Sequence, residues 1–244
     1  MIEVRNLHKR FGSVTAVDDV SFSAADGVVT GLLGPNGAGK TTTLRMLTTL
    51  IAPDRGAALI DGLSVADDPV EARRRIGVLP DARGLYPRLT AREHVEYAGE
   101  LHGIPRRQLQ PRIDALIDLL DMKSIAGRRA EGFSHGERVK VALARALVHE
   151  PRNVMLDEPT NGLDVMSTRA VRDLIRRLRE QGKCVLFSSH VMQEVSALCD
   201  RVVIIAHGRV LADGTPEEIR GRAGKENLEE AFVSVIGSDQ GLLQ

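Results

Sequence analysis

A glycine-rich stretch, Gly34-Pro35-Asn36-Gly37-Ala38-Gly39-Lys40-Thr41-Thr42, has residue types that suit phosphate binding. The apolar run 28–33 before it is typical of a buried strand, and residues 43–47 begin a helical pattern. The glycines allow the backbone to turn successive N–H groups toward phosphate oxygens, and the helix start adds a partial positive charge. A chance glycine-rich turn is the alternative, but the flanking strand and helix favour a P-loop. The stretch therefore predicts a nucleoside triphosphate site.

The P-loop also predicts what individual side chains do. In such a loop Lys40 reaches the β- and γ-phosphates, and the Thr41 hydroxyl holds Mg²⁺. The other residues expected to surround the nucleotide are Asn36, Gly37, Ala38, Gly39 and Thr42.

A pair of acids, Asp157-Glu158, follows Asn153 and the apolar residues 154–156, a pattern typical of a buried strand. We expect this strand to lie beside the P-loop strand, so that Asp157 binds Mg²⁺, usually through water. Glu158 would then point toward the γ-phosphate, where it can orient and deprotonate a water molecule. The alternative is a pair of surface acids after a strand, and the P-loop together with residues 159–164 argues against it.

The composition narrows the class of protein. The 244 residues are 43% hydrophobic, enough for a sizeable core, and 33 basic residues balance 33 acidic ones. This balance, with 3% aromatic residues and no Trp, argues against a nucleic-acid-binding surface. Cys184 and Cys199 have no metal-type spacing and indicate a reducing compartment. Without a signal-peptide pattern or an apolar run of roughly 18 residues, we expect a cytosolic protein.

Alternating strand and helix patterns predict an α/β protein with a P-loop NTPase (RecA-like) core and a mainly parallel sheet. Residues 2–11 and 15–24 are expected to form an N-terminal antiparallel β segment. No strand pattern occurs between about Tyr86 and Glu150, which predicts an inserted helical subdomain. The expected boundaries are 1–85 and 151–220 for the core, 86–150 for the helical subdomain and 221–244 for a C-terminal tail.

Two capping boxes predict where helices start in the inserted region. They are Thr90-Ala91-Arg92-Glu93 and Ser134-His135-Gly136-Glu137. In each, a hydroxyl side chain precedes a glutamate by three residues, so that the two side chains can bond to each other's backbone N–H groups. The second box opens a helix that we expect to run to about His149.

Four motifs occur in the order found in the ATP-binding cassette (ABC) ATPases, and the chain resembles this family over almost its whole length. The motifs are residues 34–42, 133–137, 154–164 and Ser189-His190. The resemblance implies that Ser134, Gly136 and Glu137 belong to the signature motif. It also implies that Asp164 is the dimer-contacting aspartate of the D-loop.

The resemblance implies roles for two further residues that the sequence alone leaves open. Phe11 precedes a turn, where an aromatic side chain usually belongs to the core. In the family the matching aromatic residue stacks on adenine. His190 follows a strand, where a lone histidine is usually structural. The matching residue in the family is the switch histidine that hydrogen-bonds the γ-phosphate.

Members of the family work as dimers, and the helix start at Ser134 gives a physical reason. Its N–H groups form an anion site like that of the P-loop. In the family, each signature motif closes over the ATP of the other subunit, so ATP joins two cassettes and hydrolysis releases them. The resemblance therefore implies a homodimer, or a paired cassette, with ATP and Mg²⁺ between the subunits.

The chain departs from the usual pattern of the family in two places. The signature reads Phe-Ser-His-Gly-Glu instead of Leu-Ser-Gly-Gly-Gln, which keeps Ser134 and Gly136 but changes the rim of the anion site. Asp81 stands where most cassettes have a glutamine that touches Mg²⁺, and it offers an oxygen ligand on a shorter, charged side chain. With residues 83–86 and 228–232, this replacement resembles the sodium-efflux (NatA-like) branch of ABC-2-type exporters.

Taken together, the resemblance implies the ATPase subunit of an exporter of sodium, or of drugs and other small molecules. It would hydrolyse ATP to ADP and phosphate and dock on a separate integral-membrane ABC-2-type permease, at the inner face of the cell membrane. We expect the docking surface around residues 81–92, with Leu85 and Tyr86 as candidates. Packing within the helical subdomain is the alternative for both side chains.

Two rival functions remain open at this point. A soluble cassette protein that acts on ribosomes or nucleic acid usually has two cassettes or a long coiled-coil insertion, and 244 residues hold neither. The second rival is a regulatory module that binds ATP without turnover. Asp81 favours it, whereas four intact residues argue against it: Lys40, Asp157, Glu158 and His190.

Overall fold

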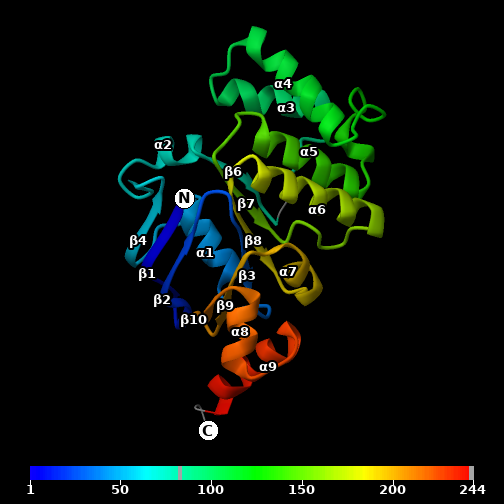
Figure 1. The fold of residues 1–244 in the computed structure, drawn as a ribbon. Helices are drawn as coiled ribbons and strands as arrows, with labels where there is room; N and C mark the ends of the chain where they lie inside the picture. Colours follow the sequence, from blue (N-terminus) through cyan, green and yellow to red (C-terminus); the bar gives the residue numbers. More distant parts are fainter. Residues whose placement is uncertain (82–83, 242–244) are drawn as a thin grey trace.

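The computed structural model describes residues 1–81 and 84–241, which form two β-sheets with helices around them (Figure 1). A six-stranded sheet has the order β10-β9-β3-β8-β7-β6, and a four-stranded sheet has the order β2-β1-β4-β5. In the larger sheet β9 and β10 pair antiparallel and the other neighbours pair parallel, which confirms the predicted fold class. The strands are β1 Ile2–Phe11, β2 Val14–Ala24, β3 Val29–Leu33, β4 Arg55–Ile60, β5 Leu63–Ser64, β6 Ile76–Leu79, β7 Asn153–Asp157, β8 Cys184–Ser189, β9 Arg201–Ala206 and β10 Arg209–Gly214.

The helices lie on both sides of the six-stranded sheet and at both ends of the molecule. In Figure 1, α3 and α4 form one end, and α8 and α9 form the other, next to the C-terminus. No helix in the described residues is long and apolar enough to cross a membrane. The helices are α1 Lys40–Leu47, α2 Pro69–Arg74, α3 Ala91–Leu101, α4 Arg106–Leu119, α5 His135–Leu147, α6 Val165–Glu180, α7 Met192–Leu198, α8 Pro216–Ala223 and α9 Leu228–Gly241.

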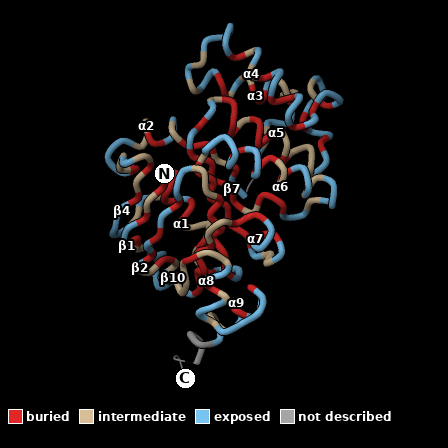
Figure 2. Tube along the Cα trace, viewed as in Figure 1, coloured by how far each residue is buried: buried red, intermediate tan, exposed pale blue. Residues whose placement is uncertain are grey.

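The central strands of the larger sheet are buried on both faces. Every residue of β3, β7 and β8 is buried. Strands of a parallel sheet covered on both faces have continuous apolar runs, which explains the patterns at 28–33 and 153–156. Figure 2 shows this buried layer through the middle of the molecule. The layer gives the loops at the strand ends a rigid support.

The chain between β6 and β7 is helical, as the sequence predicts. Its described residues contain no strand beyond an isolated bridge between Thr90 and Arg129. The first capping box forms, because Glu93 N–H donates to Thr90 Oγ1 at 3.2 Å and Thr90 N–H donates to Glu93 Oε2 at 2.7 Å. One apolar cluster joins α3, α4 and α5 to a face of the six-stranded sheet. The domain boundaries given above therefore stay a prediction.

One expected neighbour relationship is wrong. The strand β7, which carries Asp157, does not lie beside the P-loop strand β3, because β8 lies between them. Spatial order in a parallel sheet depends on where each crossover connection returns, and a local sequence pattern does not encode it. The registers place Asp157 opposite Ser188 and Leu33 opposite Ser189, so the ends of all three strands still meet at one edge.

The four-stranded sheet is larger than its sequence patterns indicate. They predict the β1–β2 hairpin and a strand at 57–60, but not that these share a sheet. In the structure β4 pairs antiparallel with β1, with Ile2 opposite Ile60. The short strand β5 extends this sheet at its edge.

Candidate nucleotide-binding site

The predicted P-loop joins the end of β3 to the start of α1. A Cβ at Gly34 would lie 2.0 Å from the carbonyl oxygen of Ile205, and a Cβ at Gly39 would lie 2.5 Å from that of Ala16. Gly39 also has a φ of 104°, a conformation that residues with a side chain rarely adopt. These two glycines allow the loop to pack closely between β2 and β9.

A hollow of about 550 Å³ lies over the P-loop. It brings the seven predicted P-loop residues together with Asp81, Glu158 and His190, which come from distant parts of the sequence. The residues that line it are Ala16, Asn36, Gly37, Ala38, Gly39, Lys40, Thr41, Thr42, Asp81, Glu158, Asn161 and His190.

Lys40 is buried at the base of this hollow, with 5% of the residue exposed. Its Nζ donates to the carbonyl oxygens of Gly34 at 2.6 Å and Pro35 at 3.1 Å. The same atom lies 3.7 Å from Glu158 Oε1. Burial lowers the pKa of the ammonium, and the charges of Glu158 and Asp157 oppose this shift. A cation that has lost much of its hydration is suited to bind an incoming phosphate.

Asp157 is buried at the end of β7, where two hydroxyl groups donate to it. Ser188 Oγ donates to Asp157 Oδ1 at 2.6 Å, and Thr41 Oγ1 donates to the same oxygen at 3.3 Å. Burial raises the pKa of the Asp157 carboxyl, the two hydrogen bonds oppose this shift, and the charges of Asp81 and Glu158 add to it. A cation bound nearby would favour the ionised form.

The oxygen atoms around Thr41 have the chemistry that Mg²⁺ requires. Thr41 and Asp157 are within hydrogen-bonding distance, and Asp81 lines the same hollow. In the part of the chain that the structure describes, no three His, Cys, Asp or Glu side chains are placed to hold a metal by themselves. Mg²⁺ is usually bound by one or two carboxylates together with water and substrate phosphates, and Thr41 and Asp157 offer oxygen atoms of this kind.

Glu158 and His190 are in direct contact at the rim of the hollow. His190 Nδ1 lies 2.9 Å from Glu158 Oε2. Glu158 has a φ of 47°, a left-handed conformation that is uncommon for residues other than glycine. Its N–H donates to Ser188 Oγ at 3.0 Å, and its carbonyl oxygen accepts from Asn161 N–H at 3.2 Å. Such strained residues are concentrated at functional sites, where neighbouring contacts hold them.

The sequence patterns do not identify Ser188, which contacts both acids, or Ala16 and Asn161, which line the hollow. The Ser188 hydroxyl donates to Asp157 and accepts from the N–H of Glu158, so it connects both acids. Only the register of β7 and β8, which pairs Asp157 with Ser188, identifies this position. Asn161 lines the hollow, and its place within the motif 154–164 is the one signal that the sequence offers.

The predicted signature residues lie away from the hollow of the same chain, at the start of α5. Ser134 caps this helix and forms the second predicted capping box with Glu137. Burial is slight at Glu137, and its pKa is lowered by the Ser134 N–H and by Arg128, whose Nη1 lies 2.8 Å from Glu137 Oε1. A Cβ at Gly136 would lie 4.0 Å from Asp164 Oδ2, so the starts of α5 and α6 are adjacent.

Asp164 caps α6, and a histidine of the signature connects this region to the P-loop hollow. Asp164 Oδ1 accepts from Ser167 N–H at 2.9 Å, and this bond lowers the pKa of the Asp164 carboxyl. His135 Nε2 donates to the carbonyl oxygen of Asn161 at 2.9 Å. Since Asn161 lines the hollow, His135 links the start of α5 to the loop that follows Glu158.

Phe11 lies at the end of β1 and is half exposed. It is not among the residues that line the hollow, and Lys9 Nζ lies 5.5 Å from its ring centroid. Its exposure leaves the ring accessible for stacking. The stacking of Phe11 on adenine remains a prediction.

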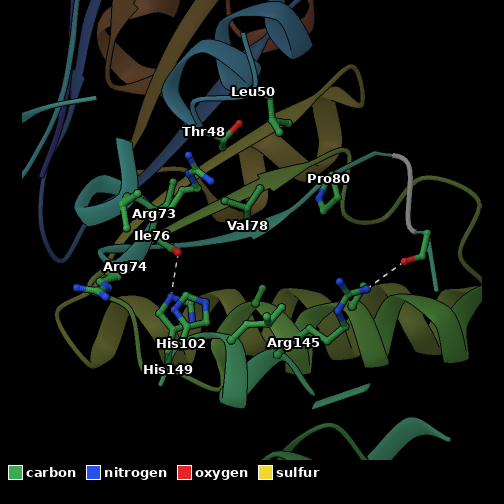
Figure 3. A pocket seen from close by; sticks show the side chains of 16 residues that line it. Thr48, Leu50, Arg73, Arg74, Ile76, Val78, Pro80, His102, Arg145 and His149 are labelled. Atoms are coloured by element: carbon green, nitrogen blue, oxygen red, sulfur yellow. Dashed lines mark hydrogen bonds between the residues drawn. The ribbon is translucent and has the colours of Figure 1, made fainter. Parts of the chain in front are cut away.

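A second hollow, of about 670 Å³, lies between α5 and the edge of the six-stranded sheet (Figure 3). We call it the basic groove, because Arg73, Arg74 and Arg145 line it and no acidic residue is among its described lining. Its rim is apolar, since Leu50 and Leu101 are 67% and 70% exposed. Arg145 Nη1 donates to the carbonyl oxygen of Gly84 at 3.0 Å across one end of the groove.

Two stacked histidines form the other end of the basic groove. The rings of His102 and His149 lie 3.7 Å apart, at an angle of 6°. His149 Nε2 donates to the carbonyl oxygen of Ile76 at 2.9 Å, as Figure 3 shows. Burial lowers the pKa of His149 to about 4, and the charges of His102, Lys183 and Arg112 contribute. Both rings are therefore neutral near pH 7, because burial and Arg74 also lower the pKa of His102.

The segment predicted to dock on a partner, 81–92, borders the basic groove. Gly84 lines the groove, and Leu85 is partly buried against the apolar core. Tyr86 is 54% exposed, and its N–H donates to His94 Nε2 at 2.9 Å. Residues 82–83, which include the predicted Arg83, lie outside the described residues. Leu85 thus packs within the subdomain, while Tyr86 remains accessible.

A buried parallel strand, a glycine-rich loop whose lysine starts a helix, and acids at the tip of a nearby strand define the P-loop nucleotide-binding class. Within this class, residues 17–161 match the family model of the ABC transporter. The "ABC transporter ATP-binding protein NatA" of Bacillus subtilis (strain 168) is 43% identical, over 97% of this chain and 98% of the relative.

Two solved structures share the fold along most of the chain. A "Structure of ATP binding subunit of ABC transporter" has a TM-score of 0.90 at 31% identity and covers 97% of this chain and 99% of its own. The "Dimeric structure of a post-hydrolysis state of the ATP-binding cassette MJ0796 bound to ADP and Pi" has a TM-score of 0.80 at 26% identity. The match covers 88% of this chain and 98% of that chain.

The chain therefore belongs to the ABC transporter family, as one of its ATP-binding, ATP-hydrolysing subunits. The predicted likeness to NatA is confirmed. Subunits of this family dimerise and work with membrane permeases.

Proposed function

We propose that this chain is the ATPase subunit of an exporter and that it binds Mg-ATP in the hollow over the P-loop. One observation carries the proposal: Lys40, Glu158 and His190 line this hollow from three separate segments. A phosphate-binding loop, a base and a hydrogen-bonding imidazole are the groups that ATP hydrolysis needs in one place.

In the proposed complex the triphosphate lies against residues 36–42. The ammonium of Lys40 exchanges its contact with Glu158 for the β- and γ-phosphates, which carry more charge. After this exchange the Glu158 carboxylate can act on a water molecule. Phe11 stacks on the adenine, for which its exposed ring is suited.

Mg²⁺ would be held by Thr41 and Asp157, with Asp81 as the third candidate ligand, and would neutralise charge on the phosphates. The hydroxyl of Ser188 donates to Asp157 and keeps its carboxylate oriented toward Thr41. Asp81 is exposed at the mouth of the hollow, and a water molecule is the natural bridge for its short side chain.

Glu158 is the proposed general base. Its carboxylate accepts a proton from a water molecule, whose oxygen bonds to the γ-phosphorus while the bond from that phosphorus to the oxygen of ADP breaks. His190 donates a hydrogen bond to the γ-phosphate. The 2.9 Å contact between His190 and Glu158 keeps both groups within reach of the same atom.

We propose that two copies of the chain share each nucleotide. Ser134 and Asp164 are not part of the described lining of the hollow, so their contact with ATP requires a second copy. The N–H groups at the start of α5, with Gly136 and Glu137, would face the γ-phosphate bound by the partner's P-loop. Hydrolysis removes the group that joins the two copies.

We propose that the membrane partner is an ABC-2-type permease, docked over the basic groove and segment 81–92, on the cytoplasmic face of the cell membrane. A groove that combines an apolar rim with cationic side chains suits a partner segment that combines both features. The proposed cargo is sodium or a drug-like compound, and likeness to the "Linearmycin resistance ATP-binding protein LnrL" supports the second of these. No nucleic acid partner is proposed.

The proposed activity is tested by the Lys40→Ala variant in an ATP hydrolysis assay with Mg²⁺. We expect kcat/KM to fall at least about 100-fold, since a phosphate-binding cation in a water-poor site is lost. Lys123→Ala, at a surface lysine paired with Asp118, is the matched control and should retain the parental rate. A Lys40→Ala variant that hydrolyses ATP like the parent would refute the proposal.

A further inference from the structure

Glu194, on α7, has a buried carboxylate that the proposed mechanism does not use. Only 4% of the residue is exposed. Thr160 Oγ1 donates to Glu194 Oε2 at 2.6 Å, and Ser189 Oγ donates to the same oxygen at 3.3 Å. Arg172 Nη2 lies 3.7 Å from Glu194 Oε1. A buried carboxylate is costly unless it is paired and hydrogen-bonded, and these contacts meet that requirement.

The three partners of Glu194 come from three segments of the chain. Thr160 lies in the loop after β7, Ser189 ends β8, and Arg172 lies on α6. Both hydroxyl donors are themselves buried, at 9% and 1% exposure. A single carboxylate therefore ties the ends of two neighbouring strands and a helix together beneath the hollow.

The two hydroxyl partners are next to the residues proposed to carry out hydrolysis. Thr160 follows Glu158 by two residues, and Ser189 immediately precedes His190. Ser189 Oγ also accepts from the N–H of Val191 at 2.9 Å, so the backbone on both sides of His190 is fixed. Moving either segment would change the contact between Glu158 and His190.

We infer that Glu194 is a positioning residue for ATP hydrolysis: its carboxylate holds the loop after Glu158 and the end of β8 so that Glu158 and His190 meet at the γ-phosphate. The inference rests on the roles proposed for Glu158 and His190. An apolar side chain of similar size would fill the same space but would fix neither segment, because it accepts no hydrogen bond.

The test is Glu194→Leu, which keeps the approximate size of the side chain and removes the acceptor of both hydrogen bonds. We expect kcat for ATP to fall about 10- to 100-fold, the range for a small displacement of reacting groups. KM for ATP should stay within about twofold of the parent, because the P-loop is untouched. Asp173→Leu makes the matching apolar substitution at an exposed acid on α6, paired with Arg176, and should leave kcat unchanged.

A second variant, Thr160→Val, removes one hydroxyl donor and keeps the shape of the side chain. If Glu194 acts through Thr160, the double variant that combines Glu194→Leu with Thr160→Val should have a kcat no lower than that of the slower single variant. The reason is that the effects of substitutions at contacting residues do not add. Losses that multiply in the double variant, or parental kcat in Glu194→Leu, would overturn the inference. A fall in melting temperature with unchanged kcat would also overturn it, since it indicates a structural role alone.

Glu158→Gln, assayed in parallel, separates this inference from the proposed function. If Glu158→Gln loses turnover while Glu194→Leu keeps it, only the role of Glu194 is refuted. If Glu158→Gln keeps turnover, the role of Glu158 as a base is refuted, and the positioning role of Glu194 with it.

Discussion

His190 Nδ1 lies 2.9 Å from Glu158 Oε2, although 32 positions of sequence separate the two residues. The contact depends on the parallel pairing of β7 with β8, which brings the ends of both strands to one edge. It places an imidazole beside the carboxylate that we propose as the base. The first prediction concerns this pair.

Glu158→Gln should bind ATP and lose at least about 100-fold in kcat, because an amide cannot accept the proton of water. Binding should persist, since the P-loop is intact and the contact of Glu158 with Lys40 is absent once phosphate binds. Single-turnover hydrolysis and nucleotide binding, measured on the same preparation, separate the two effects. Parental turnover in the variant would exclude Glu158 as the base.

A second prediction concerns the stability of the protein at acid pH. The folded-state pKa of His149 is about 4, below the ordinary value of 6.5, so unfolding lets this ring bind a proton between these values. The contribution of neutral His149 is therefore complete above about pH 6.5 and is lost as the pH falls toward 4, by up to roughly 3 kcal/mol.

The measurement is the free energy of unfolding at pH 7.5 and pH 5 for the parent and for His149→Gln. The variant should lose less stability between the two pH values, because it has no proton to take up. The control is His207→Asn, at an exposed position with a left-handed backbone that asparagine tolerates. Its free energy of unfolding should change between the two pH values by as much as that of the parent. An equal change in the free energy of unfolding for the parent and for His149→Gln would refute the lowered pKa of His149.

A third prediction concerns the basic groove. Arg74→Glu reverses one charge at its edge, and we expect association with the membrane partner to weaken about tenfold, since complementary charges guide such docking. The amount of subunit that co-purifies with the detergent-solubilised permease measures this effect. Arg176→Glu on α6 reverses a charge away from the groove and is the matched control. If both variants lose the same amount of co-purifying subunit, or if neither loses any, the docking surface lies elsewhere.

The features that the sequence predicts correctly depend on local patterns. The P-loop is one continuous stretch, and the capping boxes at Thr90 and Ser134 span four residues each. Their geometry follows from the order of residue types alone, so these elements form where the sequence predicts them. The buried strands β3, β7 and β8 are predictable for the same reason.

The features that the sequence does not predict depend on contacts between distant segments. The position of β8 between β3 and β7 follows from crossover geometry, and without it the link from Ser188 to Asp157 cannot be foreseen. The burial of Glu194 likewise requires donors from the loop after β7 and the end of β8. His102 and His149 stack although 47 positions separate them, which no local pattern indicates.

The central claim is that two copies of the chain enclose ATP between the P-loop of one and the start of α5 of the other. Sedimentation of Glu158→Gln with and without Mg-ATP tests it most directly. We predict a monomer of 26.5 kDa without nucleotide and a dimer with it, and the dimer should disappear when Ser134→Arg is added. A protein that binds ATP but stays monomeric, or a dimer that survives Ser134→Arg, would contradict the claim.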